Sequence, residues 1–313
     1  MHRAKEVYMA RARQHWVGFR ELHKHLVNAI ERFVADDMMT YAAAIAFQMF
    51  FSLFAFVIFL IALLGFLQIP GFFDRLVDQA ETVLPGQAAW IVEQVAGQMH
   101  EKSSKWLLFF GIIATLWSAS SGVRALMHAL NTAYHLEPRS TWKRYPLSIF
   151  YTIVLTVMII VAVGSVLIEP QVIGWIADQV GVGTQIGMST IFVALWTWLR
   201  FPIAVLLLMV VVALIYYLLP NADEPFRLIT LGTVLAAIVW VATSLGFSYY
   251  VSNFVFYNAT YGTLGAVLAL QIYFFISASV LLFGAEVNVE IYDQLVEDVD
   301  ERKKTQEASQ AGE

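Results

Sequence analysis

The sequence predicts an all-α, polytopic membrane protein with six transmembrane helices and with both termini in the cytoplasm. Hydrophobic residues make up 59% of the 313 residues and charged residues 14%, and the mean hydropathy is +0.67. The apolar residues fall in blocks of roughly 20, the length that a helix needs to cross about 30 Å of hydrocarbon. This composition excludes a disordered chain and an ordinary soluble domain.

The first element is a basic amphipathic segment, residues 1–37. It contains seven Lys and Arg residues, and its apolar residues recur at three- and four-residue spacing from Trp16 to Val34. That spacing places the apolar residues on one stripe of a helix, while the frequent charges argue against a cleaved signal peptide. Two arrangements are open: a helix on the cytoplasmic membrane surface, or a helix packed on the cytoplasmic end of the bundle.

The transmembrane domain is predicted to occupy residues 38–290. Its apolar blocks give six spans, and interfacial Trp residues such as Trp106 and Trp198 lie at span edges. Pro202 fits the first turn of the fourth span, where its missing N–H costs little. The six spans lie near 42–67, 106–126, 146–168, 201–219, 228–251 and 263–285.

The distribution of bases between alternate loops predicts the orientation. The N-terminal segment, the stretch from Arg124 to Arg144, the 220–227 loop and the C-terminal tail hold 15 of the 19 Lys and Arg residues. Positively charged loops stay in the cytoplasm, so both termini are predicted to be cytoplasmic. Arg200 is an exception to this pattern.

Two segments outside the spans have their own character. The first outer loop, 68–105, holds two amphipathic helical stripes separated by the Pro85-Gly86 pair. These two helices either cap the bundle or lie on the outer leaflet. The acidic tail, 291–313, is polar and short of aromatic residues, so we expect it to be cytoplasmic and largely disordered beyond a helical extension.

Ionisable residues inside a bilayer are costly and usually functional, and the middles of the six predicted spans contain none. A pathway through the bundle would therefore need neutral polar groups, although ordinary helix packing and an aromatic belt explain many of the same residues. Small residues such as Gly232 with Ala236, and Ala242 with Gly246, are spaced for close helix packing. The candidate pathway or gating residues are Ser118, Ser120, Asn131, Asn253, Asn258, Tyr261, Gln271 and Asn288.

Two charged residues lie near the cytoplasmic ends of the second and sixth spans. At matched depth, the guanidinium of Arg124 and the carboxylate of Glu286 would form a forked pair that joins the two helices. The alternative is that each side chain extends separately to the lipid headgroups. We therefore predict an interhelical ion pair between Arg124 and Glu286 as a candidate site.

Sequence signatures of enzymes are missing. The chain has no Cys, its His residues lack partners at useful spacing, and it contains no phosphate-binding loop. We expect no catalytic residue, no metal, no cofactor, no ATPase within the chain and no nucleic-acid partner. The expected partners are membrane lipids, an unknown solute, and a second copy of the chain or an envelope protein.

A set of motifs in the spans carries a resemblance to a known family. The motifs are Leu116–Ser120, Gly122–Met127, Ala129–Tyr134, Phe201-Pro202, Leu218–Asn221, Ser252–Phe254, Tyr257–Val267 and Leu282–Asn288. On these motifs the chain resembles the YihY/virulence factor BrkB family of inner-membrane proteins from about Asp37 to Glu290. One departure is Ala55, where related chains often have Pro. The resemblance implies six spans with cytoplasmic termini in the bacterial inner membrane. It brings no established catalytic or binding residues, and it carries an old ribonuclease label.

Three functions follow as hypotheses. The first is a transporter or exporter of an amphiphilic, lipid-like or small organic solute, with a path bounded by the second, fifth and sixth spans. The second is a non-transporting assembly or envelope-integrity factor. The third, a membrane-bound nuclease, finds no carboxylate or His cluster in a soluble domain to support it.

Overall fold

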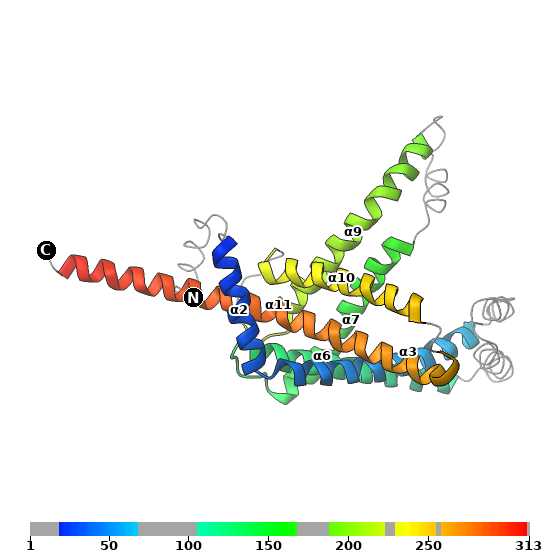
Figure 1. The fold of residues 1–313 in the computed structure, drawn as a ribbon. Coiled ribbons are helices and arrows are strands. Elements are labelled where there is room, and N and C mark those ends of the chain that lie inside the picture. The colour runs from blue at the N-terminus through cyan, green and yellow to red at the C-terminus, as the bar shows by residue number, and fades with distance from the viewer. Residues whose placement is uncertain (1–18, 68–104, 168–187, 223–228, 255–257, 312–313) are drawn as a thin grey trace.

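The computed structural model describes residues 19–67, 105–167, 188–222, 229–254 and 258–311. These ranges form seven α-helices and no strand (Figure 1). The helices are α2 (Phe19–Ala35), α3 (Met38–Leu67), α6 (Lys105–Ala133), α7 (Thr141–Leu167), α9 (Met188–Leu218), α10 (Leu231–Phe254) and α11 (Asn258–Ala311).

Every one of these helices except α2 contains a stretch long and apolar enough to cross a membrane, so the prediction of six spans is confirmed. The second, fourth and sixth spans are longer than the sequence pattern predicted. The fourth now includes Arg200 and the sixth includes Glu286, whereas Arg124 already lay in the predicted second span. Arg200 and Glu286, which were predicted to flank the membrane, therefore lie within helices that can span it.

The helices converge at one end of the molecule, the end at which α2 lies. Among the described helices, α3 packs against α6 and α11, α10 packs against α11, and α7 packs against both α6 and α9. Away from this end, α7 and α9 leave the other helices at an angle (Figure 1). We call the converging end the α2 end.

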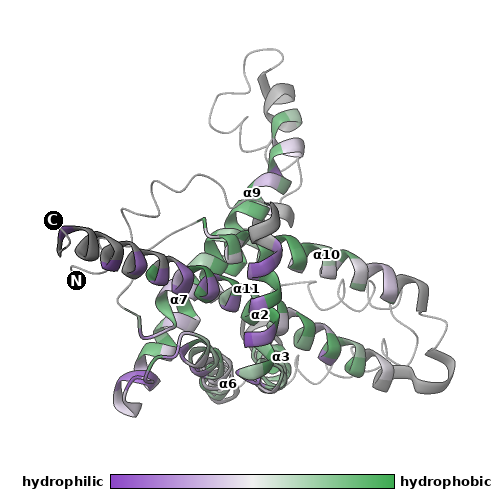
Figure 2. Ribbon diagram, turned by 60° about the vertical axis from the view of Figure 1, so that its left-hand side comes forward, coloured by the Kyte–Doolittle hydropathy of each residue, from purple (hydrophilic) through white to green (hydrophobic). Residues whose placement is uncertain are grey.

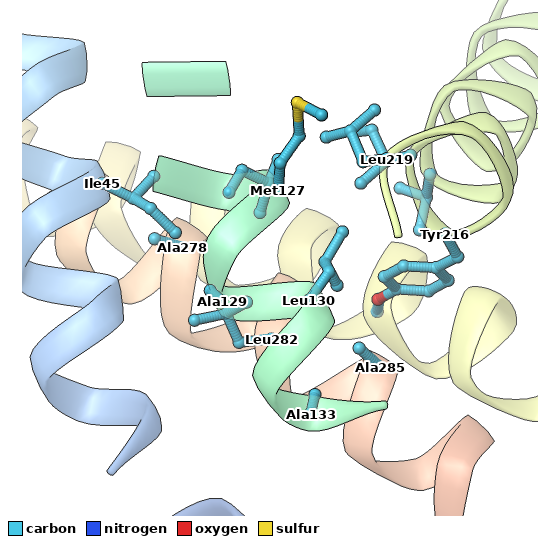
Figure 3. Packing of buried hydrophobic residues seen from close by; sticks show 14 of the residues in the cluster. Ile45, Met127, Ala129, Leu130, Ala133, Tyr216, Leu219, Ala278, Leu282 and Ala285 are labelled. Carbon is cyan, nitrogen blue, oxygen red and sulfur yellow. The ribbon is translucent and has the colours of Figure 1, made fainter. Parts of the chain in front are cut away.

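The hydrophobic core lies at the α2 end. Met127 and Leu130 of α6 meet Tyr216 of α9 and Leu282 of α11, and all four are buried (Figure 3). Alanines such as Ala285 fill the remaining space, so the helices approach closely. Close packing of this kind fixes the relative positions of α6, α9 and α11.

Gly232 of α10 and Gly284 of α11 lie in backbone contact. A Cβ atom on Gly232 would collide with the carbonyl oxygen of Gly284 and would lie 2.6 Å from Asn288 Oδ1. Asn288 Oδ1 in turn accepts a hydrogen bond of 2.9 Å from the Gly232 amide. A Cβ on Gly284 would collide with the Tyr216 hydroxyl, so α9, α10 and α11 meet at one point.

A tight turn at Asp36 and Asp37 sets the direction of α2. Asp37 has a φ of 53°, the left-handed region that Asp adopts more readily than most residues. The Asp36 amide donates to the Arg32 carbonyl (2.8 Å), and the Thr40 amide donates to the Asp37 carbonyl (3.0 Å). This turn lets α2 fold back across α11.

Some expectations need correction. The tail is not disordered over most of its length, because α11 continues as a helix to Ala311 and is hydrophilic there (Figure 2). Glu, Lys, Gln and Ala favour a helix, and a chain that extends an existing helix has no nucleation cost. Pro202 lies well inside α9 rather than in its first turn. The two amphipathic helices predicted in 68–105 fall outside the described residues.

Candidate functional site

Two polar clusters lie at the α2 end among the described residues. The first, the Arg124 site, consists of Trp117, Ser120 and Arg124 of α6 with Tyr145 and Ser148 of α7. The second, the carboxylate cluster, consists of Arg32 of α2 with Glu286, Glu290 and Asp293 of α11.

Two hydroxyl groups hold the guanidinium of Arg124. Its Nη1 donates to Ser120 Oγ at 2.7 Å and to Ser148 Oγ at 3.3 Å. Both hydroxyls donate their own hydrogen to a backbone carbonyl one turn back, Ser120 to Trp117 (2.9 Å) and Ser148 to Tyr145 (2.7 Å). Each hydroxyl oxygen is therefore oriented to accept from Arg124.

Aromatic rings flank the same guanidinium. Arg124 Cζ lies 4.7 Å from the ring centroid of Tyr145 and 5.5 Å from that of Trp117. Both distances are within the range of a cation–π interaction. The rings stabilise the positive charge without neutralising it.

No carboxylate in the described part of the chain lies within ion-pair distance of Arg124. Its Nε and Nη2 donate to no described residue, and neither is among the buried nitrogens that lack a partner. These atoms are therefore accessible. Arg144, at the start of α7, is close enough for its positive charge to act on Arg124, and its buried Nε has no hydrogen-bond partner.

The predicted ion pair between Arg124 and Glu286 is wrong. Arg124 faces α7, whereas Glu286 Oε2 lies 3.6 Å from Arg32 Nε of α2. The sequence placed the two residues at a common depth, but depth does not give the direction in which a helix presents a side chain. That direction depends on which neighbouring helix packs on each face.

The carboxylate cluster attaches α2 to α11. Glu286, Glu290 and Asp293 recur at four- and three-residue spacing, which places them on one face of α11. Arg32 Nη1 lies 2.7 Å from Asp293 Oδ2 and 3.6 Å from Glu290 Oε2. Burial lowers the pKa of Arg32. The hydrogen bond to Asp293 and the charges of the three carboxylates together raise this pKa by more than burial lowers it, so the pKa lies above its ordinary value. Arg32 therefore stays charged.

Glu286 is the buried member of the cluster. Its side chain has no exposed surface, and neither carboxylate oxygen has a hydrogen-bond partner. Glu290 is better satisfied, because Asn28 Nδ2 and Gln294 Nε2 donate to its Oε1 at 2.7 Å and 2.6 Å. The buried charge of Glu286 thus depends on the Arg32 guanidinium.

The docking of α2 answers a question that the sequence left open. Ala29 is buried against Val287 and Ile291 of α11, so α2 packs on the bundle. Its other face keeps an apolar stripe exposed, with Val27, Ile30 and Val34 at exposed fractions of 39%, 54% and 70%.

The remaining predicted site residues are scattered. Ser120 belongs to the Arg124 site, and the Ser118 carbonyl accepts from the Ser121 hydroxyl. Asn131 Oδ1 accepts from the amide of Asn221 at 2.7 Å and so joins the end of α6 to the turn after α9. Asn288 binds the backbone of Gly232.

The four other candidates lie on α10 and α11. Gln271 is half-buried on α11, and its Oε1 is buried without a partner. Asn253 belongs to α10, and Asn258 and Tyr261 belong to α11, but their side chains fall outside the described ones.

A shallow pocket lies between α10 and α11. It has a volume of ≈ 430 Å³ and is lined by Ser244, Phe247, Ser248, Val251 and Tyr273. The hydroxyl groups of Ser244 and Tyr273 lie 3.0 Å apart. Its lining is mainly apolar and carries no charge.

Tyr145, Ser148 and Arg32 are site residues that the sequence pattern does not reveal. One local signal exists in α6, because Ser120 and Arg124 are four residues apart and therefore share a helix face. The partners on α7 and α2 have no such signal, since they meet α6 and α11 through tertiary packing.

Known proteins match most of this chain. A family model described as virulence factor BrkB matches residues 29–310. The "putative ribonuclease-like protein YfkH" of Bacillus subtilis is 33% identical over 268 residues, which are 85% of this chain and 94% of that protein. A "UPF0761 membrane protein" of Alkalilimnicola ehrlichii is 28% identical over 262 residues, or 82% of this chain and 55% of that protein.

A shorter match covers part of the chain. A "UPF0761 membrane protein" of Tolumonas auensis is 29% identical over 136 residues, which are 44% of this chain and 42% of that protein. The matches thus span nearly the whole Bacillus protein but about half or less of these two membrane proteins. No solved structure matches the chain.

Proposed function

The chain is an integral membrane protein of the virulence factor BrkB family, and from this premise we propose that it transports an amphiphilic, lipid-like or small organic solute. The alternative is a non-transporting assembly or envelope-integrity factor.

The Arg124 site carries this proposal. A charged side chain inside a transmembrane helix is costly, up to about 2.5–3.5 kcal/mol at the centre of the helix on insertion scales, so an arginine within a span needs a compensating interaction. Arg32 lies within ion-pair distance of three carboxylates. Arg124 instead donates to two hydroxyl groups and lies over two aromatic rings. Its remaining N–H groups donate to none of the residues that the structure describes, so they can bind a polar group on a solute.

Loss of Arg124 is expected to slow transport. Purified protein in liposomes would be given a phospholipid labelled with a dithionite-sensitive fluorophore, and the loss of fluorescence would report lipid movement between leaflets. We expect the Arg124→Gln variant to move the lipid at least about tenfold more slowly than the unmodified protein, because the charged contact that receives the headgroup is absent.

Arg200→Gln is the matched control for this experiment. Arg200 is also an arginine within a span, and its Cζ lies 4.8 Å from the ring centroid of Phe201. We expect its removal to change the rate by less than about twofold. If liposomes with the unmodified protein move the probe no faster than protein-free liposomes, the proposal for amphiphilic solutes is contradicted. Equal rates for Arg124→Gln and the unmodified protein would show that Arg124 is not part of the transport site.

We also propose that the α2 end faces the cytoplasm of a bacterium and that the protein lies in its inner membrane. The positive-inside bias of the loops supports this orientation. Because the chain has no Cys, a single Ser140→Cys change in the exposed turn between α6 and α7 gives one reactive thiol. A membrane-impermeant maleimide is expected to label it in lysed cells but not in intact cells; labelling in intact cells would reverse the orientation.

One observation favours the alternative, an assembly factor that binds a second copy of the chain or an envelope protein. The exposed stripe of Val27, Ile30 and Val34 lies on α2, and the end of α11 projects beyond the bundle (Figure 1). Arg124→Gln is expected to be deficient in transport. If envelope assembly stays normal in cells with this variant, the assembly function does not depend on transport.

We further propose that the protein has no enzymatic activity, although the printed name of the Bacillus relative is ribonuclease-like. Metal-dependent cleavage of RNA by the purified chain, abolished by a point substitution, would contradict this proposal.

A further inference from the structure

We propose that the Arg124 site binds the anionic, phosphate-containing headgroup of an amphiphile whose acyl chain lies along an exposed apolar stripe of α6. This inference rests on the proposed function and names the chemical class of the solute. It follows from the charge at the site, the free donors of Arg124 and the surface that leads away from it.

The site carries positive charge without a nearby countercharge. Arg124 has no carboxylate partner in the described part of the chain, and Arg144 adds a second positive charge close to the first. Lys143 is exposed in the first turn of α7. Two cations that repel each other are both stabilised when an anion binds between or beside them.

The unused donors of Arg124 suit a phosphate group. Nη1 already donates to Ser120 and Ser148, which leaves Nε and Nη2 on an accessible edge of the planar group. Two parallel N–H donors match two oxygens of one phosphate group. The two serines and the rings of Trp117 and Tyr145 hold the guanidinium in place, so little side-chain entropy is lost on binding.

An apolar stripe leads from this site toward the far end of α6. Ile113 and Trp117 precede Arg124 by 11 and seven residues, which places them on the same helix face. Both are exposed, at 46% for Ile113 and 59% for Trp117. Phe110 and Trp106 continue the stripe at 49% and 67% exposure.

The part of the stripe from Arg124 to Ile113 has the length of one leaflet. Eleven residues of helix from Arg124 to Ile113 rise about 16 Å, close to half of the roughly 30 Å hydrocarbon thickness. A headgroup at Arg124 would therefore place its acyl chain against Trp117 and Ile113. Free phosphate would use the charge but leave this surface uncovered, so the combination favours an amphiphile.

The experiment compares two lipids that share their tails. The purified full-length protein in detergent is titrated with dioleoyl phosphatidylglycerol or dioleoyl phosphatidylcholine, and bound lipid is counted by native mass spectrometry. We expect phosphatidylglycerol to bind at least about tenfold more tightly than phosphatidylcholine. We expect Arg124→Gln and Arg144→Gln to lose this preference, Arg124→Lys to keep part of it and Arg200→Gln to keep it fully.

Two further arms test the tail and the source of the anion. Ile113→Gln is expected to weaken the binding of both lipids by a similar factor, because the substitution makes the stripe polar without changing the charge of the site. Inorganic phosphate at millimolar concentration is expected to leave the lipid bound, whereas a free-anion site would exchange it.

Equal binding of the two lipids, an unchanged preference in Arg124→Gln and Arg144→Gln, or displacement by inorganic phosphate would overturn the inference. Selective binding without lipid movement in liposomes would uphold the inference and contradict the proposed transport. Lipid movement with no headgroup preference would support the proposed transport and overturn the inference.

Discussion

The Gly232→Ala variant is expected to be strongly destabilised. The added methyl group would collide with the Gly284 carbonyl and with Asn288 Oδ1, and a backbone carbonyl inside a packed helix cannot move aside as a flexible side chain can. Overpacking of this kind costs about 3 kcal/mol, which exceeds the gain of about 1 kcal/mol from placing Ala instead of Gly in a helix. The melting temperature in detergent should fall, and protein yield should fall with it.

Gly246→Ala is the matched control, because Gly246 lies in the same helix and a Cβ there would meet nothing within 4 Å. We expect this variant to melt at or above the temperature of the unmodified protein. Equal melting temperatures of the Gly232→Ala and Gly246→Ala variants would show that α10 does not approach α11 at Gly232 as closely as the structure shows.

Arg32→Met is expected to produce the second large loss of stability. Glu286 is fully buried and its carboxyl group has no hydrogen bond, so removal of the Arg32 charge leaves a buried carboxyl group without a charged partner. Breaking a buried ion pair in this way costs about 3–5 kcal/mol. Thermal unfolding of the purified variant measures the loss, and we expect α2 to separate from α11 before the spans unfold.

Two further variants make this prediction specific to the pair. Lys24→Met removes an exposed base from the same helix and should change stability by less than about 0.5 kcal/mol. The double variant of Arg32→Met with Glu286→Leu should recover much of the loss, because it removes both partners of the pair. An Arg32→Met variant as stable as Lys24→Met would show that the cluster does not attach α2.

Some of the site was readable from the sequence and some was not. Gly232 with Ala236 and Ala242 with Gly246 have the same small-residue spacing, yet α11 lies against Gly232 and not against Gly246. Spacing shows that a helix can pack closely on one face, but a partner has to occupy that face. Asn131 and Asn288 show the same limit, since each binds backbone atoms of another segment.

The two charged candidates illustrate why partners are harder to predict than spans. Arg124 and Glu286 were each recognisable as costly residues near the membrane, and both do belong to polar clusters. Their partners, Ser148 of α7 and Arg32 of α2, lie 24 and 254 residues away along the chain. A local pattern carries no information on contacts that depend on the angles between helices.

The sequence by itself determined that this chain forms six membrane-spanning helices and which residues within them are polar. Those features depend on the length and hydropathy of local segments, because each helix satisfies its own backbone hydrogen bonds in the bilayer. Only the tertiary structure decided that α2 folds onto α11, that Glu286 pairs with Arg32, and that Arg124 keeps donors free beside α7. The physical reason is that pairing depends on the rotation and close approach of whole helices, which the packing of Gly232, Gly284 and the buried core at the α2 end determines.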